Sequence, residues 1–464
     1  MDILALRTSI TGDVLGPDDD GYLEGATVSH GPGSPLVVIR PADAADVATA
    51  IGFARDHALE LSVRGGGHDS LGRSTNDGGV VIDMRSLADI EVAAADDRGA
   101  LVTIGGGAIW GDVAAALEPH GLAISSGDTK SVGVGGLSLG GGVGWFVRHW
   151  GLAIDSLVSV EIVLADGRIV TASETEHPDL FWAIRGGGGN FGAVTRFTFR
   201  AHPLPNGVVA GAIDLAADAD LAAAFTVWRE AMRVAPEQLT ANYLGLPSFG
   251  EGMPATSQIT FVWAGDDLEA ATTAITPLLA MPGVTGHTIE RKRYADVLMD
   301  PQHEGAEEPV EAPGEQPDSE QAGPPAMRMI DDNGFAATFD DALIAELVDV
   351  RRELGETILM VRILGGAYSR VDPDATAWGF RDTEAWLVSV AFVPDAMYDE
   401  AAPRARAAWS RLHPWLKGMY GNFSSLDNPV TTMYPPTTLA RLRSIKTAYD
   451  PANLFHRTHN IAPA

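Results

Sequence analysis

The chain has 464 residues and a mass of 48.8 kDa, a length that usually corresponds to about two or three domains. Apolar residues make up 45% and charged residues 20%, as in a globular protein with a large core, and no stretch approaches the roughly 20 apolar residues of a membrane span. The net charge of −30 repels phosphate groups, which excludes nucleic acids and anionic membranes as partners. Cysteine is absent, which excludes disulfides, thiolate nucleophiles and cysteine-ligated metals and leaves redox chemistry to a bound cofactor.

The first 200 residues alternate strands, helices and glycine-rich turns. Residues 1–34 are expected to be irregular, and Asp43 is expected to open an amphipathic helix with Val47 and Ile51 on its apolar face. Asp166-Gly167 predicts the turn of a hairpin. The expected elements are strands at 36–39, 61–63, 80–84, 101–104 and 194–199, a second helix at 108–119, and the hairpin at 159–172.

After residue 204 the glycine-rich turns disappear and longer elements follow. The pattern predicts strands at 207–214, 258–264, 357–365 and 386–393, helices at 219–233, 267–280, 340–354 and 400–416, and a short helix within the last 45 residues. The segment 301–326 contains seven acidic residues, no basic residue and many prolines, which predicts a mobile surface loop. Alternating helix and strand signals along the whole chain predict an α+β fold, or a mixed α/β fold, in two lobes.

The 52 glycines are concentrated at 65–67, 105–107, 133–144 and 186–192. Because glycine is costly to order, these clusters indicate backbone that lies close to something large and flat or phosphorylated. One match to the dinucleotide fingerprint G-x-G-x-x-G follows an expected helix and precedes an expected strand, at Gly187, Gly189 and Gly192. A Rossmann site requires the opposite order, so we reject that interpretation; the chain also lacks the Gly-Lys pair of a P-loop.

The sharpest local feature is the run Arg64-Gly65-Gly66-Gly67-His68-Asp69-Ser70, directly after an expected strand. Three successive glycines expose backbone N–H groups suited to a pyrophosphate, and they leave His68 beside the bound group. The alternative is a tight turn with a solvent-exposed histidine, and for this run taken alone that alternative is favoured.

Three segments taken together change that balance. Residues 64–70, then Val-Gly-Val-Gly-Gly-Leu-Ser-Leu-Gly-Gly-Gly-Val-Gly-Trp at 132–145, then Gly-Asn-Phe-Gly-Ala-Val-Thr at 189–195 resemble the FAD domain of the vanillyl-alcohol-oxidase/p-cresol-methylhydroxylase flavoproteins. The tail at 449–463 is similar to that of the berberine-bridge-enzyme-like branch. The resemblance covers 36–200 and 416–464 closely and 205–415 weakly. It implies an FAD-binding domain of two α/β subdomains at 1–204, a substrate domain with an antiparallel sheet and helices over the flavin at 205–415, and a segment that returns to the FAD lobe at 416–464.

The resemblance implies FAD as cofactor, attached through His68. Many members carry a second link through a cysteine three residues before Val132, and this chain has Thr129 there, so we expect one covalent bond only. Val132 matches a flavin-facing position where a small residue leaves room for oxygen, which favours an oxidase over a dehydrogenase; its alternative role is ordinary packing. The residues that the resemblance places along the cofactor are Arg64, Gly65, Gly66, Gly67, His68, Asp69, Ser70, Thr129, Val132, Gly133, Gly135, Gly136, Gly140, Gly142, Gly144, Asn190, Gly192, Val194 and Asn453.

The catalytic base departs from the family pattern. Family members often carry Tyr-x-Asn-Tyr, whose second tyrosine removes the substrate proton, but this chain has Tyr420-Gly421-Asn422-Phe423. Tyr420 and Asn422 are candidate positioning groups. Tyr368, expected on a strand of the substrate lobe, is a further candidate, and its alternative is a half-buried strand aromatic. Because some members oxidise amines, whose nitrogen lone pair assists hydride loss, the phenylalanine keeps that substrate class open.

Three functions are therefore carried forward. The first is an oxidase that takes hydride from a C–H bond next to nitrogen or oxygen and passes the electrons to O2, giving H2O2. The second is a dehydrogenase with a quinone or carrier acceptor, and the third is a flavin-binding protein without activity. We expect a small-molecule substrate, no metal, no signal peptide and a cytoplasmic location, and the oligomeric state stays open.

Only four of the 32 basic residues are lysine. An acidic, lysine-poor surface is typical of proteins adapted to a salt-rich cytoplasm, in which surface charge is screened. A GC-rich coding sequence, which favours arginine, is the alternative.

Overall fold

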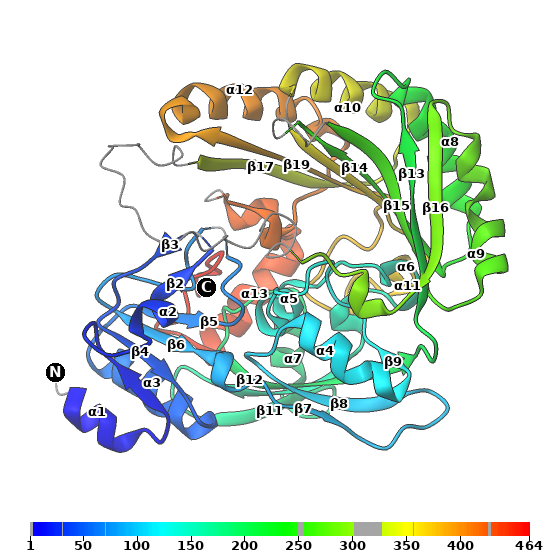
Figure 1. The fold of residues 1–464 in the computed structure, drawn as a ribbon. Coiled ribbons are helices and arrows are strands. Elements are labelled where there is room, and N and C mark those ends of the chain that lie inside the picture. The colour runs from blue at the N-terminus through cyan, green and yellow to red at the C-terminus, as the bar shows by residue number, and fades with distance from the viewer. Residues whose placement is uncertain are drawn as a thin grey trace, which may run out of the picture.

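The computed structural model describes residues 3–29, 31–69, 71–248, 255–300, 327–355, 357–425 and 428–464. The chain forms two lobes that face each other (Figure 1). Ser70 and the expected loop at 301–326 lie outside the described residues.

The first lobe contains two sheets. In the first, β4, β6 and β5 are parallel and β1 is antiparallel to β4, in the order β1-β4-β6-β5. The second is antiparallel in the order β11-β10-β12-β8-β7, and β9 pairs with β12. The elements are α1 Ile3–Ser9, β1 Asp13–Leu15, α2 Tyr22–Ala26, β2 Thr27–Val28, β3 Gly31–Pro32, β4 Val37–Arg40, α3 Ala44–Asp56, β5 Leu61–Arg64, β6 Val80–Asp83, β7 Ile90–Val92, β8 Ala100–Gly105, α4 Trp110–Leu117, β9 Leu122–Ala123, α5 Val134–Gly140, α6 Val147–Trp150, β10 Leu157–Val163, β11 Ile169–Ser173, α7 Pro178–Ile184 and β12 Ala193–Pro203.

The second lobe is one large antiparallel sheet in the order β16-β13-β15-β14-β18-β19-β17. Helices α8, α9, α10 and α12 cover its outer face, and the other face is turned toward the first lobe (Figure 1). Its elements are β13 Val208–Leu215, α8 Leu221–Val234, β14 Leu239–Leu246, β15 Thr256–Trp263, α9 Leu268–Ile275, β16 Val284–Lys292, β17 Met327–Ala336, α10 Asp341–Leu354, β18 Ile358–Ile363, α11 Ala367–Arg370, β19 Ala385–Pro394 and α12 Tyr398–Ser410. Finally, α13 Pro436–Tyr449 packs its Leu439, Leu442 and Ile445 into the core of the first lobe, so the end of the chain returns there.

Several expected elements are confirmed with their local causes. Asp43 caps α3 and accepts hydrogen bonds from the backbone N–H groups of Ala45 and Asp46, as its position before the apolar pattern predicts. The hairpin β10–β11 turns at Asp166-Gly167, where Gly167 has a φ of +88°. The α+β class and the two lobes are also confirmed.

Other expectations need correction. The expected strand around Tyr368 is the short helix α11, because the left-handed Gly365 and Gly366 (φ +103° and +60°) turn the chain before it. The first 34 residues, expected to be irregular, contain the helices α1 and α2 and the short strands β1, β2 and β3. The last helix, α13, is 14 residues long rather than short. The strands β14, β16 and β17 were not anticipated, because their side chains are mostly buried on both faces or mostly exposed and show no clear alternation.

One buried arginine of the first lobe binds the second lobe through backbone carbonyls. The guanidinium of Arg148, in α6, donates to the carbonyl oxygens of Leu239 (2.8 Å) and Leu364 (2.6 Å) and to those of Met232 and Ala235 at the end of α8 (both 3.2 Å). Burial lowers the pKa of Arg148 to about 10, which leaves it charged at neutral pH. The arginine therefore satisfies the carboxyl end of a helix and joins the two lobes.

Two buried ion pairs cross the junction in the opposite direction. Arg381 of the second lobe donates to both carboxylate oxygens of Asp155 in the first (2.8 and 2.6 Å), and both side chains are almost fully buried. Arg362 of β18 donates to Asp128, and its Nε donates to the amide oxygen of Asn242 at 2.7 Å. Because their partners belong to the other lobe, these charges fix how the lobes sit against each other.

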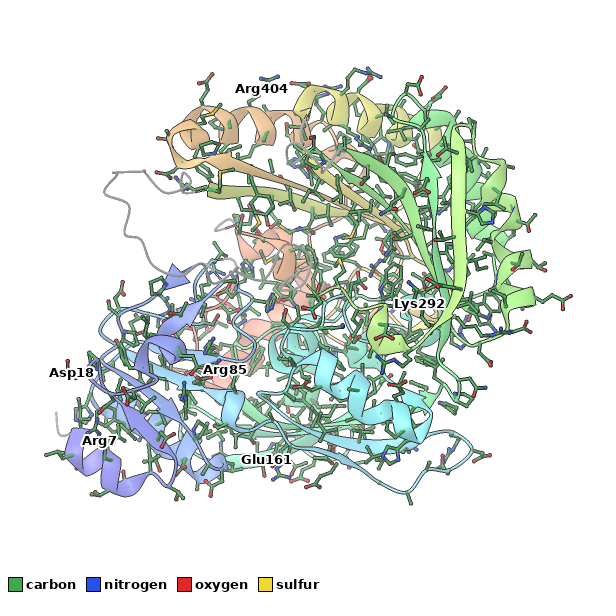
Figure 2. The ribbon with its side chains drawn as sticks, viewed as in Figure 1. Arg7, Asp18, Arg85, Glu161, Lys292 and Arg404 are labelled. Atoms are coloured by element: carbon green, nitrogen blue, oxygen red, sulfur yellow. The ribbon has the colours of Figure 1, made fainter. Side chains whose placement is uncertain are left out.

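The periphery carries the exposed charge. Asp18 and Arg404 are exposed and lie at the outer edges of the first and second lobes, respectively (Figure 2). Within the part of the chain that the structure describes, no helix is both long and apolar enough to cross a bilayer.

Candidate functional site

The buried side chain of Arg64 supports the loop that follows β5 from the protein interior. The buried guanidinium of Arg64 donates to the backbone oxygen of Glu24 (3.2 Å) and to the carboxylate of Asp83 (3.4 Å), and burial lowers its pKa. Gly67 lies over it with a φ of +75°, and a Cβ on Gly67 would come 3.1 Å from the Arg64 Nε atom. A side chain at Gly67 would therefore face both backbone strain and a close contact. The arginine shapes the loop from the protein side.

His68 leaves this loop with an exposed ring. Its Nε2 atom lies 2.9 Å from the hydroxyl of Ser131. Desolvation lowers the pKa of the imidazole, and the contact with Ser131 opposes this only in part, so the ring is neutral at pH 7. Beside it, Gly66 and Gly133 are in backbone contact, since a Cβ on Gly66 would lie 2.9 Å from the Gly133 Cα atom. The two glycine-rich segments thus meet at His68.

Asp69 shapes the turn that follows. Its carboxylate accepts hydrogen bonds from the backbone N–H groups of Leu71, Arg73 and Ser74, so it acts as an internal cap for that turn. At Gly65 a Cβ would make only an ordinary van der Waals contact, with the carbonyl oxygen of Gly106 at 3.8 Å.

Helix α5 and the turn that follows it contain glycines with different surroundings. A Cβ would collide with the Asn422 side chain at Gly140, lie 2.5 Å from the Ala153 methyl group at Gly142, and lie 2.7 Å from the Ser126 carbonyl carbon at Gly144. Gly136, by contrast, is exposed, and a Cβ there would meet no atom within 4 Å. Packing therefore explains the first three glycines but leaves Gly136 unexplained. Gly135 is buried, and a Cβ there would lie 3.0 Å from the Gly106 oxygen.

Thr129 and Val132 lie on the segment that enters α5, and both are half-buried. Thr129 pairs with Met299 of the second lobe, and the carbonyl oxygen of Val132 accepts a hydrogen bond from the N–H of Trp110 at 3.0 Å. Val132 also packs against the main core of the first lobe.

The third glycine-rich segment is tied to the C-terminal tail. The buried Asn190 side chain donates to the carbonyl oxygens of Gly187 (2.9 Å) and His459 (3.2 Å) and accepts from the N–H of Ile461 (2.9 Å). Val194 is buried in β12, and Gly192 has a φ of +156° with its Cβ position 2.6 Å from the Val163 oxygen. This segment is therefore shaped by the tail and by its own sheet.

A buried lysine, which the sequence analysis did not single out, anchors the tail. Lys446 donates to the carboxylate of Asp450 (2.6 Å) and to the carbonyl oxygens of Asn190 (2.6 Å) and Phe455 (2.9 Å), and neither charged side chain has exposed surface. The i, i+4 spacing of Lys446 and Asp450 in a lysine-poor chain was the available signal. Asn453, in the turn after Asp450, has a φ of +54° and a buried amide oxygen without a hydrogen-bond partner.

Tyr420 and Asn422 join the second lobe to α5. The Tyr420 hydroxyl accepts hydrogen bonds from the Gly142 N–H and from the Asn422 amide (both 3.0 Å), and burial raises its pKa to about 12. The Asn422 amide also donates to the carbonyl oxygen of Gly136 at 3.2 Å. Phe423 is 41% exposed, and its ring stands edge-on to Trp386 at 4.7 Å between centroids. Tyr420 and Asn422 are thus brought together at the glycine helix, with the phenyl ring beside them.

One amide on β17 organises this turn. Asn333 accepts from the N–H of Tyr420 (2.7 Å) and donates to the carbonyl oxygens of Tyr420 (3.2 Å) and Phe423 (2.7 Å). Sequence reasoning missed it because these contacts span about 90 residues, for which no local pattern exists.

Tyr368 does not join this group. Its ring has no exposed surface, and its hydroxyl donates to the carbonyl oxygen of Phe380 and lies 3.0 Å from the Thr383 hydroxyl. Burial raises its pKa to about 12. Such a hydroxyl suits packing and not exchange with a small molecule.

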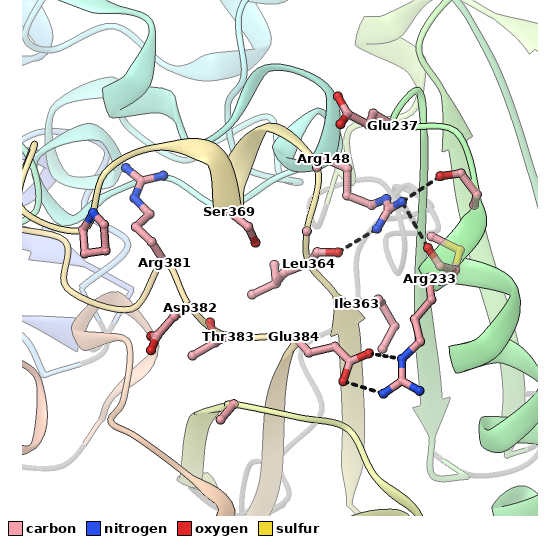
Figure 3. Close-up of a pocket in the computed structure, with 16 residues that line it drawn as sticks. Arg148, Arg233, Glu237, Ile363, Leu364, Ser369, Arg381, Asp382, Thr383 and Glu384 are labelled. Carbon is pink, nitrogen blue, oxygen red and sulfur yellow. Dashed lines mark hydrogen bonds and ion pairs between the residues drawn. The ribbon is translucent and has the colours of Figure 1, made fainter.

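Two cavities lie away from His68. One of about 480 Å3 is lined by Arg148, Arg233 and Glu384, and two hydrogen bonds join Glu384 to Arg233 across its edge (Figure 3). The other, of about 470 Å3, lies on the first lobe beside Asp43 and Glu161. Neither is lined by the predicted site residues. Within the described ranges, no group of acidic or histidine side chains is arranged to bind a metal ion.

The geometry around His68 fits an extended dinucleotide. Gly136 and Gly189 both face open space, and the exposed imidazole lies where two glycine-rich segments meet. Buried polar atoms without hydrogen-bond partners occur on or next to these segments at Arg64 Nε, Ser74 Oγ and Ser138 Oγ, and in the C-terminal tail at Asn453 Oδ1. Such atoms are costly unless a ligand or water satisfies them. A group with many acceptors, such as a pyrophosphate or a flavin ring, meets this need.

Comparison with known proteins agrees with this geometry. Residues 35–173 match the family model of an FAD binding domain, and residues 419–462 match that of berberine and berberine-like proteins. The chain is 31% identical to (R)-6-hydroxynicotine oxidase of Paenarthrobacter nicotinovorans over 99% of this chain and 98% of that protein. It is 29% identical to xylooligosaccharide oxidase of Thermothelomyces thermophilus over 93% of this chain and 88% of that protein.

Solved structures give the same result. The crystal structure of 6-hydroxy-D-nicotine oxidase from Arthrobacter nicotinovorans superposes with a TM-score of 0.80 at 28% identity, covering 98% of this chain and 99% of that one. A chitooligosaccharide oxidase superposes with a TM-score of 0.83 at 26% identity, covering 99% of this chain and all of that one (100%). The glycine-lined junction at His68 and the full-length similarity lead to one conclusion: the chain belongs to the berberine-bridge-enzyme-like FAD-linked oxidoreductases and is an FAD-dependent enzyme.

Proposed function

We propose that this enzyme is an oxidase of a small amine, with FAD attached through His68 alone and O2 as electron acceptor. FAD, when bound, accepts a hydride from the substrate and passes the electrons to O2. The absence of cysteine excludes a second, cysteinyl link. The relatives named above include an oxidase of a nicotine derivative and oxidases of oligosaccharides, so the family alone does not decide the substrate class.

The observation that carries the amine assignment is the chemistry of the 420–423 turn. Phe423 offers a bare ring where a phenolic base would be required, and the Tyr420 hydroxyl is engaged with Gly142 and Asn422 and has a pKa of about 12. An alcohol must lose a hydroxyl proton as its hydride leaves, and this turn supplies no group to take it. An amine that is already neutral needs no such base, because its lone pair assists hydride loss from the adjacent carbon.

The chain's own part is to bind and orient. Asn422 joins α5 to the turn through the Gly136 oxygen, and the exposed Phe423 ring, which packs edge-on against the buried Trp386, presents an apolar surface. Orientation of the reacting carbon against the cofactor supplies a large part of the rate enhancement in such enzymes. Val132, half-buried at the entry to α5, is the small residue proposed to leave room for O2.

The test is anaerobic reduction of the purified enzyme by matched amine and alcohol substrates, followed by flavin bleaching in a stopped-flow instrument. We expect amines to reduce the flavin at a rate that rises with pH through the amine's own pKa, and we expect alcohols to be much slower. Admission of O2 should then restore the yellow colour with release of H2O2. Reduction by alcohols at the same rate as by amines would overturn the substrate class, and no reoxidation by O2 would overturn the oxidase.

A further inference from the structure

A histidine of the C-terminal tail, His459, lies between two segments of the site. Its Nδ1 atom is 3.1 Å from a guanidinium nitrogen of Arg73, in the loop that follows β5, and its Nε2 atom is 2.9 Å from the carbonyl oxygen of Gly421. Gly421 belongs to the turn that carries Phe423. One half-buried ring therefore connects the loop that contains His68 to the 420–423 turn.

The two partners fix the protonation state of this ring. A guanidinium group has only N–H donors, so the Nδ1 atom of His459 must accept with its lone pair. A carbonyl oxygen has only lone pairs, so the Nε2 atom must carry the proton and donate it. His459 is therefore a neutral imidazole with its proton on Nε2, the form that accepts from Arg73 and donates to Gly421 at the same time.

The backbone of His459 is held independently of its ring. The buried amide of Asn190 donates to the His459 carbonyl oxygen (3.2 Å) and accepts from the N–H of Ile461 (2.9 Å). Lys446, which has no exposed surface, donates to the Asn190 carbonyl oxygen at 2.6 Å. The ring thus projects from a buried, hydrogen-bonded base in the first lobe, so its position relative to that lobe is fixed.

The turn receives support from both lobes. Asn333 of the second lobe binds backbone groups of Tyr420 and Phe423, and His459 binds the backbone of Gly421 between them. The imidazole lies directly against the turn, since a Cβ on Gly421 would come 3.0 Å from the His459 Cδ2 atom. Phe423 is 41% exposed, so its place depends on how the backbone of the turn is held.

We propose that His459 is a positioning residue for the transfer of hydride from substrate to FAD. Through its Nε2–H it holds the 420–423 turn, and with it the Phe423 ring, at a fixed place relative to the loop that follows β5. The inference rests on the proposed function for its substrate, an amine oriented by that ring. Orientation at a reacting carbon is sensitive to small shifts, since a displacement of about 1 Å can cost about 10²-fold in rate.

The experiment compares His459→Gln with His459→Leu in the full-length holoenzyme. A glutamine amide offers an oxygen to Arg73 and an N–H to Gly421, so it can replace both hydrogen bonds of the neutral imidazole. Leucine fills similar space and replaces neither. The matched control is His456→Leu, which removes another tail histidine whose Nε2 atom lies 3.2 Å from the Glu60 carboxylate instead of against the turn.

The readout is the limiting rate constant of anaerobic flavin reduction by an amine, with the amine's dissociation constant from the same stopped-flow titration. This rate constant belongs to the bound flavin, so loss of flavin or of folded protein does not change it. We expect His459→Leu to lower the rate constant roughly three- to tenfold, the effect of one lost hydrogen bond, and to change the dissociation constant by less than about threefold. His459→Gln should stay within about twofold of the wild type, because it keeps both hydrogen bonds. His456→Leu should match the wild type.

Two further measurements test the geometry itself. In 15N NMR of protein with labelled histidine, the His459 signals are assigned by their loss in His459→Gln, and they should show a proton on Nε2 and a lone pair on Nδ1. Arg73→Met should slow reduction by itself but cause no further loss in the His459→Leu background, because the two residues act through one contact.

Three results would overturn the inference: a proton on Nδ1, equal rate constants in the Gln and Leu variants, or additive effects of Arg73→Met and His459→Leu. Failure of the proposed function looks different. If no amine reduces the wild-type flavin but an alcohol does, the amine assignment is wrong, and the same variants compared with that alcohol still decide the role of His459. If amines reduce every variant at the wild-type rate, the inference is wrong and the amine assignment stands.

Discussion

Different physical constraints decide which residue types the two lobes can carry. In the first lobe, backbone approaches backbone: Gly66 meets Gly133, and a Cβ on Gly107 would lie 2.6 Å from the Arg85 Cα atom. No side chain fits at such positions, so glycine is required. In the second lobe, the face turned toward the first carries side chains such as Arg362 and Trp386, which are paired across β18 and β19. Many side chains can fill a sheet face, so its sequence is free to vary. Short sequence motifs therefore identify the cofactor site, whereas no such motif identifies the substrate.

The largest expected effect concerns the junction between these regions. Arg381→Met would leave the Asp155 carboxylate buried without its guanidinium, and we expect a loss of about 3–5 kcal/mol in the free energy of unfolding. Arg233→Met is the matched control, because Arg233 makes an equally bidentate pair with Glu384 (2.6 and 3.0 Å) but is 41% exposed. We expect that control to lose less than about 1 kcal/mol. Denaturant unfolding measures both; equal losses would show that the lobes are not held together by the buried pair.

The next effect tests the backbone rule inside the first lobe. Gly133→Ala would push a Cβ into Gly66 and should destabilise the fold by about 1–3 kcal/mol and reduce bound flavin as well. Gly136→Ala lies inside helix α5, which Gly133 immediately precedes. The new Cβ meets no protein atom, so the unfolding free energy should stay unchanged or rise by up to about 1 kcal/mol, while flavin content falls. Thermal unfolding and flavin absorbance measure the two responses. Full flavin content in Gly136→Ala would mean that the open space there is not the cofactor's.

These rules explain which features could be predicted from the sequence. The glycine clusters, the Asp43 cap and the turn at Asp166-Gly167 are local, so their positions were predicted. The helix α5 was not predicted, because its glycines have a low helix propensity. Its packing against Gly106 and Asn422 outweighs that low propensity in the folded protein.

Long-range contacts set the limit of prediction in the second lobe. The Arg381–Asp155 pair spans 226 residues, and Asn333 reaches the Tyr420 turn across 87. No spacing in the sequence marks such pairs. The predicted strand at Tyr368 was wrong for the same reason. The Gly365-Gly366 turn that redirects the chain packs against Arg148 of the other lobe, a contact that the local sequence does not show.

A smaller, pH-dependent effect belongs to the second lobe. Asp332 on β17 has a pKa raised to about 7, mainly by burial; its own backbone neighbour and Arg406 lower it, and Asp331 raises it. Its pKa in the unfolded chain is about 3.9, so between roughly pH 4 and pH 7 the folded state binds more protons and stability falls as pH rises. We expect Asp332→Asn to remove this loss. The difference in unfolding free energy between the variant and the wild type should shift in favour of the variant by about 1–3 kcal/mol from pH 4 to pH 7.5. Urea unfolding at several pH values measures it, and parallel curves for the two proteins would contradict the raised pKa.

The smallest effect on stability is the most informative about chemistry. Phe423 is 41% exposed, so Phe423→Tyr should change the unfolding free energy by less than about 0.5 kcal/mol. The new phenol would stand beside Trp386 at the turn where the family places its base, and it should raise the rate of flavin reduction by alcohols by about 10²-fold or more. The rate with neutral amines should stay within about threefold, because no proton has to be removed from them. Phe423→Leu serves as the control, since it changes the ring without adding a hydroxyl. If alcohols gain nothing from the tyrosine, the missing base is not what separates the substrate classes, and the side chains of the second-lobe sheet, beginning with Arg362, become the determinants to test.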